Sequence, residues 1–274
     1  MNYKTIMVSL ALDRPNEACL AVAGDLAERF DARVIGIAAS DLRPPLYFEE
    51  GAYAENLIRE EENAIRRRLS ELEAEFHGSV RKRTKSVEWR SALATPANYL
   101  VQQSRAADIL VVGTRTEAIV DPSVAVDPAD VLMRAGRPLL VVPPTAEWLD
   151  LRSVLVAWKD VKEARRAVLD ALPILAVAKD VTIAEIPEEG SARVDALSHV
   201  EDVAAWLRSH GILASVVASE PTADVPGQLD WIMANAGADL VISGAYGHSR
   251  LREWALGGVT RHLLTSSRFV FLSH

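Results

Sequence analysis

The sequence has little of several features that mark particular classes of protein. It contains one cysteine, Cys19, among 274 residues, so a disulfide within the chain and a metal site built on paired cysteines are both excluded. Cys19 lies in the apolar pattern of a predicted helix, which favours a buried structural thiol. The six histidines show none of the HxH, HxxxH or HExxH spacings that are typical of zinc sites.

The chain also lacks an excess of positive charge and long apolar runs. Lys and Arg number 30 against 38 Asp and Glu, a net charge of -8, which argues against a broad binding surface for nucleic acid or anionic membrane. No window approaches the ~18 apolar residues of a membrane span, and Asp13 and Arg14 interrupt the first apolar run before it would serve as a signal peptide. We therefore expect a cytoplasmic protein with no nucleic-acid partner and no membrane partner.

What the sequence does contain is an alternation of short apolar runs with amphipathic stretches, and that alternation repeats. ADILVVGT at Ala107 recurs as ADLVISGA at Ala238, and RPLLVV at Arg137 recurs as RFVFLS at Arg268, both at an offset of 131 residues. The alternation indicates βαβ units and parallel sheets, and the repeat indicates two copies of one fold. We predict an α/β protein of two tandem, doubly wound, five-stranded domains, 1–146 and 147–274, that form a pseudo-two-fold pair.

The predicted elements have the same order in both halves. Strands are predicted near 4–10, 33–39, 86–91, 108–113 and 138–142, and again near 153–158, 181–186, 213–218, 239–243 and 268–272. Helices are predicted near 15–30, 49–76, 96–106 and 128–136, and again near 160–178, 192–209, 225–236 and 258–266.

Four glycines crowd the stretch SGAYGHSRLREWALGGVT, residues 243–260. Gly244 ends a predicted strand, Gly247 follows it, and Gly257 and Gly258 directly precede a predicted helix. In an open parallel sheet, ligands bind beyond the carboxyl ends of the strands where the strand order reverses. Glycines there let a backbone approach a ligand closely, and the first N–H groups of a helix are unpaired, so the combination suits phosphate. The alternative is a tight turn with close helix–sheet packing and no ligand.

Other motifs fit this stretch poorly. It is neither a P-loop nor a GxGxxG loop. A catalytic triad of Ser243 or Ser249 with His248 and Asp239 is disfavoured, because neighbouring strand positions point to opposite faces and no GxSxG elbow occurs. We assign no catalytic residue and no resident metal site.

The spacing G-x2-G-x9-G resembles the nucleotide loop of the universal stress protein family. In this sequence the motif is Gly244-Ala-Tyr-Gly247, nine residues, then Gly257-Gly258-Val259-Thr260. The resemblance covers the whole chain, because tandem members carry two such domains, and VLVAWKDVKEARRAVLDALPIL looks like the opening of a second domain in bacterial tandem members. It implies that the glycines hold ribose and phosphates and that Thr260 supplies a hydroxyl.

Two positions depart from the family pattern. Gly258 replaces a Ser or Thr, so its amide but no side chain would reach a phosphate. Lys159, which follows Trp158 at the end of a predicted strand, stands where the family usually places an Asp that meets adenine. His248, within the nine-residue loop, is a candidate phosphate contact, with a solvated surface role as the alternative.

The first half keeps little of the glycine motif. At the offset of 131 residues only Gly113 is retained, and the other positions become Thr116, Val126, Asp127 and Ala129. An Asp at the start of a phosphate-binding helix would repel phosphate. We therefore predict that the first half binds no nucleotide and that Asp127 is the N-cap of a plain helix with Pro128 at its first position.

These observations lead to one hypothesis and two alternatives. The first is a cytoplasmic tandem universal stress protein whose second domain binds ATP or another adenine nucleotide, with Mg²⁺ held mostly by phosphates and water, and whose nucleotide state alters its contacts with unidentified proteins. The second is an interaction or structural protein in which both loops are vestigial. Weak ATP hydrolysis is a third, for which the sequence offers no general base. The sequence leaves open whether two chains form a homodimer.

Overall fold

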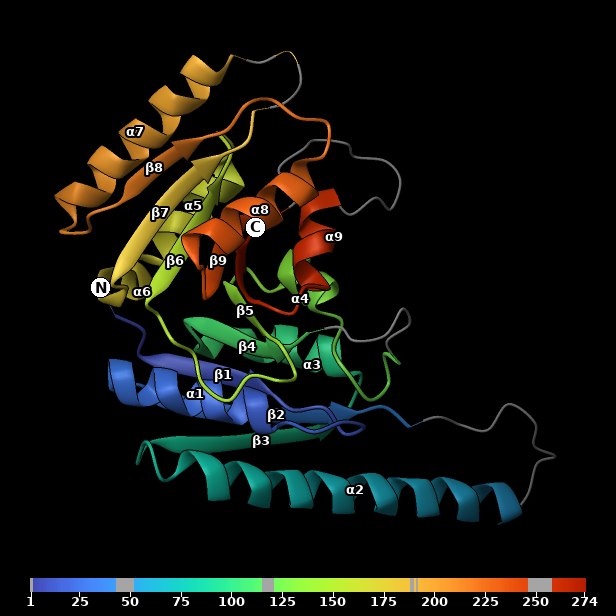
Figure 1. The fold of residues 1–274 in the computed structure, drawn as a ribbon. Coiled ribbons are helices and arrows are strands. Elements are labelled where there is room, and N and C mark those ends of the chain that lie inside the picture. The colour runs from blue at the N-terminus through green and yellow to red at the C-terminus, as the bar shows by residue number, and fades with distance from the viewer. Residues whose placement is uncertain (1, 43–51, 115–120, 188–189, 191, 246–257) are drawn as a thin grey trace. The chain divides into compact units, whose positions relative to one another are not determined.

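Strands and helices alternate along the chain, as the sequence predicts. The computed structural model describes residues 2–42, 52–114, 121–187, 190, 192–245 and 258–274, and it divides into two α/β units (Figure 1). The N-terminal unit comprises Tyr3–Ala135 and Pro144–Trp148, and the C-terminal unit comprises Met1–Asn2, Gly136–Pro143 and Leu149–His274.

The N-terminal unit contains a parallel sheet in the order β3-β2-β1-β4. Its strands are β1 (Thr5–Ser9), β2 (Arg33–Ser40), β3 (Val87–Leu93) and β4 (Ile109–Gly113). Its helices are α1 (Glu17–Phe30), α2 (Ala52–Val80), α3 (Pro96–Gln103) and α4 (Pro128–Arg134), with a 3₁₀ turn at Ser104–Ala106. The central strands β1 and β4 are almost wholly buried, as expected for apolar strands of a parallel sheet covered on both faces.

The C-terminal unit repeats this arrangement, with the order β5-β10-β9-β6-β7-β8. Its strands are β5 (Leu139–Val142), β6 (Ser153–Trp158), β7 (Asp180–Glu185), β8 (Ser215–Ala218), β9 (Leu240–Gly244) and β10 (Phe269–Ser273). Its helices are α5 (Lys162–Asp170), α6 (Leu172–Val177), α7 (Arg193–Ser209), α8 (Val225–Ala236) and α9 (Gly258–Leu264). All described strand pairs of this unit are parallel except that of β5 with β10.

The pairing of β5 with β10 follows a local two-fold axis. β5 is the fifth predicted strand of the first half, but its contacts place it in the C-terminal unit, antiparallel to β10. Leu140 pairs with Phe271, and the flanking pairs are Leu139 with Leu272 and Val141 with Val270. Because the repeat offset makes Leu140 and Phe271 equivalent, this register is symmetric about their pair. The last strands of the two repeats thus pair through the same edge, as equivalent strands of two identical chains do in a two-fold symmetric dimer.

Local sequence signals account for several helix ends. The predicted N-cap at Asp127 is confirmed, since its carboxylate accepts a hydrogen bond from the N–H of Ala129 at 3.0 Å and Pro128 begins α4. Asp224 caps α8 in the same way, through the N–H of Gly227. The single helix predicted near 160–178 is wrong in one respect: it is divided at Ala171 into α5 and α6. Pro173 lies in the first turn of α6 and has no N–H to continue the preceding helix.

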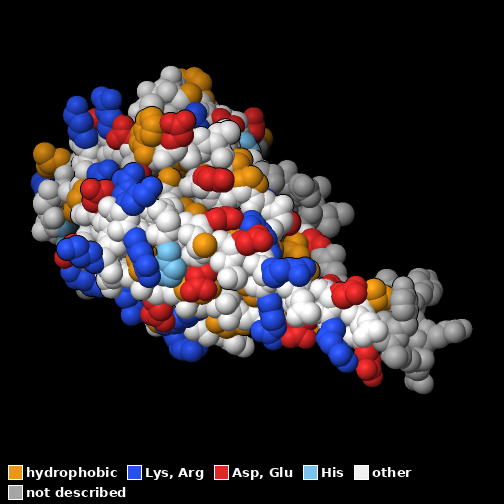
Figure 2. Space-filling view, turned by 90° about the horizontal axis from the view of Figure 1, so that it is seen from below, with side chains coloured by type: hydrophobic (Ala, Val, Ile, Leu, Met, Phe, Trp, Pro, Cys, Tyr) orange, Lys and Arg blue, Asp and Glu red, His pale blue; other side chains and the backbone are white. Residues whose placement is uncertain are grey.

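The core of each unit lies between its sheet and its helices. In the N-terminal unit, Phe76 of α2, Met7 of β1 and Leu26 of α1 are fully buried. On the face shown in Figure 2, Lys and Arg side chains are interspersed with Asp and Glu. That face therefore carries no broad patch of one charge, in keeping with the argument from composition.

Candidate functional site

The strand order of the C-terminal unit places its topological switch point between β6 and β9. The chain proceeds from β6 through β7 to β8 on one side, and from β9 to β10 on the other. Ligands of such sheets bind outside the carboxyl ends of the strands at this point. The segments that leave these two ends begin at Lys159 after β6 and at Ala245 after β9. The glycine motif therefore starts at the place where the fold class binds its ligands.

Gly244, the last residue of β9, has a packing reason to be glycine. A Cβ atom built on it would lie 2.4 Å from the backbone N of Ala164 and 2.5 Å from the carbonyl carbon of Glu163, both in α5. These are backbone atoms of a helix, so they offer no flexible side chain that would move aside. The absence of a side chain at Gly244 thus allows α5 to pack directly against the end of β9.

Gly258, Val259 and Thr260 form the start of α9. Gly258 is exposed, Val259 is half-buried and Thr260 is buried, with 6% of its surface exposed. A Cβ built on Gly258 has no described atom within 4 Å. The glycine at this position is therefore not required by the described packing, in contrast to Gly244.

Trp158 and Lys159 lie at the end of β6, beside the end of β9. Trp158 is buried, and its indole Nε1 has no hydrogen-bond partner among the described residues. Lys159 is half-buried. Asp160, the next residue, forms an ion pair with Arg165 of α5 at 2.5 Å. The carboxylate that directly follows Lys159 in the sequence is therefore already paired with a guanidinium.

Three predicted site residues lie outside the described part of the chain. They are Gly247, His248 and Gly257. Their roles stay predictions, as does the assembly of the full G-x2-G-x9-G loop around a ligand. The described residues of the motif are those at its two ends, Gly244 and Gly258–Thr260.

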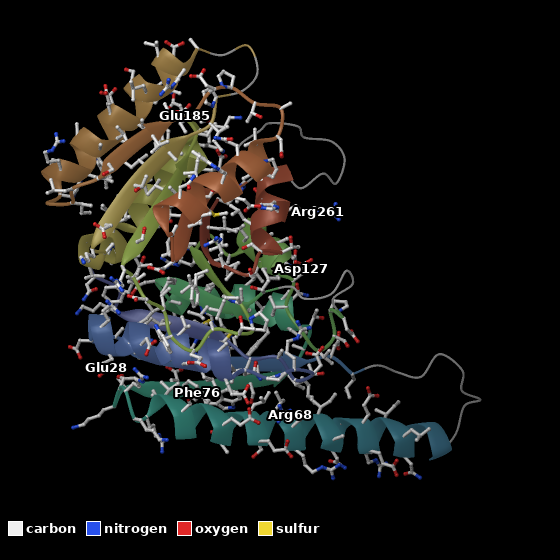
Figure 3. The ribbon with its side chains drawn as sticks, viewed as in Figure 1. Glu28, Arg68, Phe76, Asp127, Glu185 and Arg261 are labelled. Carbon is white, nitrogen blue, oxygen red and sulfur yellow. The ribbon has the colours of Figure 1, made fainter. Side chains whose placement is uncertain are left out.

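A pair formed by the buried Glu185 and the partly exposed His199 lies beside the switch point and was not predicted from the sequence. Glu185 ends β7 (Figure 3) and is the register partner of Trp158. Both of its carboxylate oxygens lie within 3.2 Å of Nδ1 of His199 in α7. Burial raises the pKa of Glu185, and the nearby Asp160 acts in the same direction, while His199 and Lys159 oppose the shift. The sequence signal was a single acidic residue that follows the apolar residues Ile183 and Ala184 of this strand.

The corresponding place in the N-terminal unit has a different composition. Gly113 ends β4, and a Cβ there would lie 3.7 Å from Sγ of Cys19, an ordinary contact. Asp127 is used as a helix cap. Cys19 is buried, as predicted, and burial raises its pKa to about 12. The thiol is therefore protonated at neutral pH and unreactive while it stays buried.

Among the described residues, no three His, Cys, Asp or Glu side chains gather closely enough to hold a metal ion. Within the same part of the chain, no helix has both the length and the hydropathy needed to cross a membrane.

Comparison with known proteins identifies the fold. No family model matches the sequence, and no curated protein matches it. A universal stress protein from Archaeoglobus fulgidus DSM 4304 has a similar structure, with a TM-score of 0.69 and 17% identity, covering 98% of this chain and 95% of that one. A putative universal stress protein from Pseudomonas aeruginosa UCBPP-PA14 aligns with a TM-score of 0.62 and 15% identity, over 99% and 93% of the two chains.

A third structure, a functionally unknown protein from Pseudomonas aeruginosa PAO1, aligns with a TM-score of 0.61 and 14% identity over 99% of this chain and 92% of that one. Each of these alignments spans both units, and the neighbours named as stress proteins belong to the family that the glycine spacing resembles. The chain therefore has the fold of full-length universal stress proteins, a mostly parallel α/β fold that its two units share.

Proposed function

We propose that the chain is a tandem universal stress protein whose C-terminal unit binds an adenine nucleotide as a regulatory module. The observation that carries the proposal is the position of the glycine motif. Its first glycine ends β9 at the switch point beside β6, and its last residues begin α9. A motif with the spacing of a nucleotide loop thus starts where this fold class places ligands.

The residues at the two ends of the motif have different proposed roles. Gly244 brings α5 against the sheet, which shapes the floor of the crevice. Gly258 and Thr260 are the described candidates for phosphate contacts, and Lys159 supplies a positive charge at the end of β6 for an anionic ligand. ATP, or another adenine nucleotide, is the proposed ligand, and Mg²⁺ would be held mostly by its phosphates and by water. The bound state would alter contacts with partner proteins.

Two observations favour the alternative, an interaction protein with a vestigial loop. The packing of α5 explains Gly244 without any ligand, and the burial of Thr260 is that of a core residue. The two functions differ in whether the protein gains stability from nucleotide.

Thermal unfolding with and without ATP and Mg²⁺ tests the proposal. A ligand at 100 times its Kd adds about 2.7 kcal/mol to the free energy of unfolding, so the melting temperature should rise with ATP concentration. Thr260→Val, which keeps the side-chain volume and removes the hydroxyl, should raise the Kd about two- to ten-fold, since one hydrogen bond contributes about 0.5–1.5 kcal/mol.

Thr265→Val is the matched control. Thr265 follows the same helix, and its hydroxyl donates to the carbonyls of Arg261 and His262 at 3.1 Å, so its loss affects the helix end and not the loop. We expect an unchanged response to ATP. Absence of a shift in the wild-type protein, after extraction of any copurified nucleotide, would reject the nucleotide proposal in favour of the interaction protein.

A further inference from the structure

A small cavity lies at the switch point of the N-terminal unit, where β1 is flanked by β2 and β4. It is lined by Arg14 and Asn16 of the segment after β1, by Cys19 of α1, by Gly113 of β4, and by Ala125 with Val126. Its volume is about 40 Å³, which is room for a few water molecules. The described residues around Arg14, Cys19 and Val126 therefore leave only a small space at this point.

The filling segment is Asp121–Val126, which runs across the carboxyl ends of the strands. The carbonyl of Ser123 accepts the N–H of Asp41 at 2.8 Å, and the carbonyl of Val124 accepts the N–H of Leu12 at 3.3 Å. Asp41 directly follows β2, and Leu12 lies in the segment after β1. The backbone donors at two neighbouring strand ends, which in an open crevice would face a ligand or water, are thus bound by the chain's own carbonyl groups.

Asp121 fixes the shape of this segment. Its Oδ1 accepts hydrogen bonds from the backbone N–H of Ser123 at 3.0 Å and from the Ser123 hydroxyl at 2.8 Å. Its carbonyl accepts the N–H groups of Val124 and Ala125 at 3.2 and 3.1 Å. An aspartate that bonds the backbone two residues ahead is a stable turn former, so the side chain of Asp121 holds the carbonyls of Ser123 and Val124 in place.

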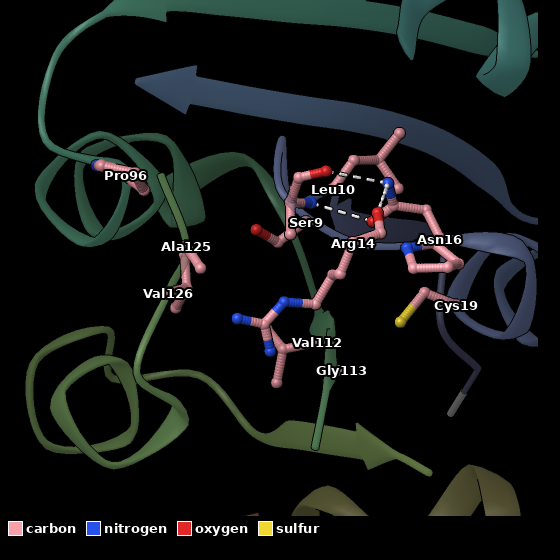
Figure 4. A pocket seen from close by; sticks show the side chains of 12 residues that line it. Ser9, Leu10, Arg14, Asn16, Cys19, Pro96, Val112, Gly113, Ala125 and Val126 are labelled. Atoms are coloured by element: carbon pink, nitrogen blue, oxygen red, sulfur yellow. Dashed lines mark hydrogen bonds between the residues drawn. The ribbon is translucent and has the colours of Figure 1, made fainter. Parts of the chain in front are cut away.

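The residues after β1 and β2 that this segment contacts are held in place by further hydrogen bonds. Arg68 of α2 donates from Nε to the carbonyl of Leu12 at 3.2 Å. Thr95 donates its hydroxyl to the carboxylate of Asp41 at 2.9 Å. Asn16, which is buried, binds both the N–H and the carbonyl of Ala11 (Figure 4). Both strand ends are therefore held in the position that the segment bridges.

We propose that Asp121–Val126 is an internal strap, which occupies the N-terminal crevice in place of a ligand and keeps this unit closed to molecules much larger than water. In the repeat, residues 121–126 correspond to residues 252–257 of the second half, the later part of the nucleotide loop. The same part of the fold thus supplies a strap in the first half. The strap itself requires no ligand in the C-terminal unit, so it stands independently of the function proposed above.

Cys19 makes the strap testable, because it is the single cysteine of the chain and lines the cavity beneath the strap. Its rate of reaction with an aromatic disulfide reagent under native conditions reports how often the crevice opens. In the closed state, burial and the raised pKa suppress the reaction. Asp121→Ala removes the carboxylate that shapes the strap and should raise the labelling rate about ten-fold. Ser123→Ala removes the hydroxyl contact, keeps the carboxylate of Asp121 and should raise the labelling rate about two- to three-fold.

Asp224→Ala is the matched control. It removes an aspartate that caps α8 through the N–H of Gly227 at 3.0 Å, in the other unit, and should leave the labelling rate of Cys19 unchanged. Labelling is repeated at several low urea concentrations, because opening of the strap exposes little surface and depends weakly on urea, whereas global unfolding depends on it steeply.

The labelling rates of Cys19 distinguish a closed crevice from an open one. Faster labelling in Asp121→Ala and Ser123→Ala, with a weak urea dependence and an unchanged control, supports the strap. Wild-type labelling at the rate of the urea-unfolded chain would show an open crevice and overturn the proposal. Labelling that follows global unfolding in every variant would overturn it as well. If Asp121→Ala fails to fold, Ser123→Ala decides the question by the same criteria.

Discussion

Gly244 and Gly258 belong to one motif in the sequence, yet their surroundings give them different roles. At Gly244 an added Cβ would overlap the backbone of Glu163 and Ala164, so any side chain forces α5 away from β9. At Gly258 the described atoms leave the space open, and the backbone there lies outside the left-handed region that favours glycine. Spacing alone treats the two glycines alike, because it carries no information on which helix lies behind each.

This difference predicts that a substitution at Gly244 changes stability, whereas a substitution at Gly258 changes the affinity for ATP. Gly244→Ala should lower the free energy of unfolding by about 1–3 kcal/mol, with or without ATP, because the helix must shift to admit the methyl group. Gly258→Ser should leave stability nearly unchanged and lower the Kd for ATP about two- to ten-fold, since it adds one hydroxyl beside the proposed phosphates. Chemical unfolding and calorimetric titration measure the two effects.

Gly258→Ala is the control for the second substitution, because it adds the Cβ without the hydroxyl. A tighter Kd in the alanine variant as well would assign the gain to the helix start and not to a hydrogen bond. Normal stability of Gly244→Ala together with a lost response to ATP would contradict the packing role of Gly244.

Among the elements, α7 and β7 are joined by a contact between a buried carboxyl group and a histidine. Glu185 is buried at the end of β7 and meets His199 of α7 at 3.1–3.2 Å. Lys159 and Asp160 approach the same carboxyl from the end of β6. Burial outweighs the favourable partners, and the pKa of Glu185 is raised. The charged form is therefore less favourable in the folded protein than in the unfolded chain.

This contact predicts a pH dependence of stability. Because the folded protein holds the Glu185 proton to a higher pH than the unfolded chain does, the contribution of Glu185 is fully present below the usual Glu range, about pH 4. It is lost as the pH rises through the raised pKa. Glu185→Gln should therefore become more stable relative to the wild-type protein as the pH rises from about 4 towards neutrality. Urea unfolding at a series of pH values measures the difference.

Glu220→Gln provides the comparison. Glu220 lies in the same unit and pairs with Arg193 at 3.0 Å, but its side chain is 77% exposed, so solvent screens the interaction. Its stability relative to the wild-type protein should change little over the same pH range. A Glu185→Gln difference that is constant with pH, or that moves in favour of the wild-type protein, would contradict the assignment.

The elements themselves could be predicted from the sequence, whereas their contacts could not. Apolar runs at strand spacing located β6 and β9, and the Asp127–Pro128 pair located the start of α4, because these signals are local. The division between α5 and α6 was missed although Pro173 marks it. The partner of Glu185 and the helix behind Gly244 depend on residues brought together by the sheet order, which no local pattern contains.

At the scale of the whole molecule, a repeated fold carries two topological switch points whose described surroundings differ. The symmetric pairing of Leu140 with Phe271 shows how closely the two halves correspond at β5 and β10. The ends of their central strands differ more. In the N-terminal unit the carbonyls of Ser123 and Val124 occupy the strand ends, while the C-terminal half carries the glycine motif. Duplication followed by divergence of one loop would yield this division without disturbing the sheet.

The division predicts the stoichiometry of nucleotide binding. If the C-terminal unit binds an adenine nucleotide and the strap closes the N-terminal unit, each chain should bind one nucleotide, not two. Isothermal titration of nucleotide-free protein with ATP and Mg²⁺ gives the number directly, and native mass spectrometry checks it. Thr260→Val should weaken that single site, whereas Asp121→Ala should leave its Kd unchanged. Two sites of similar affinity would show that ATP displaces the strap, and no binding would leave the strap intact while rejecting the function proposed for the C-terminal unit.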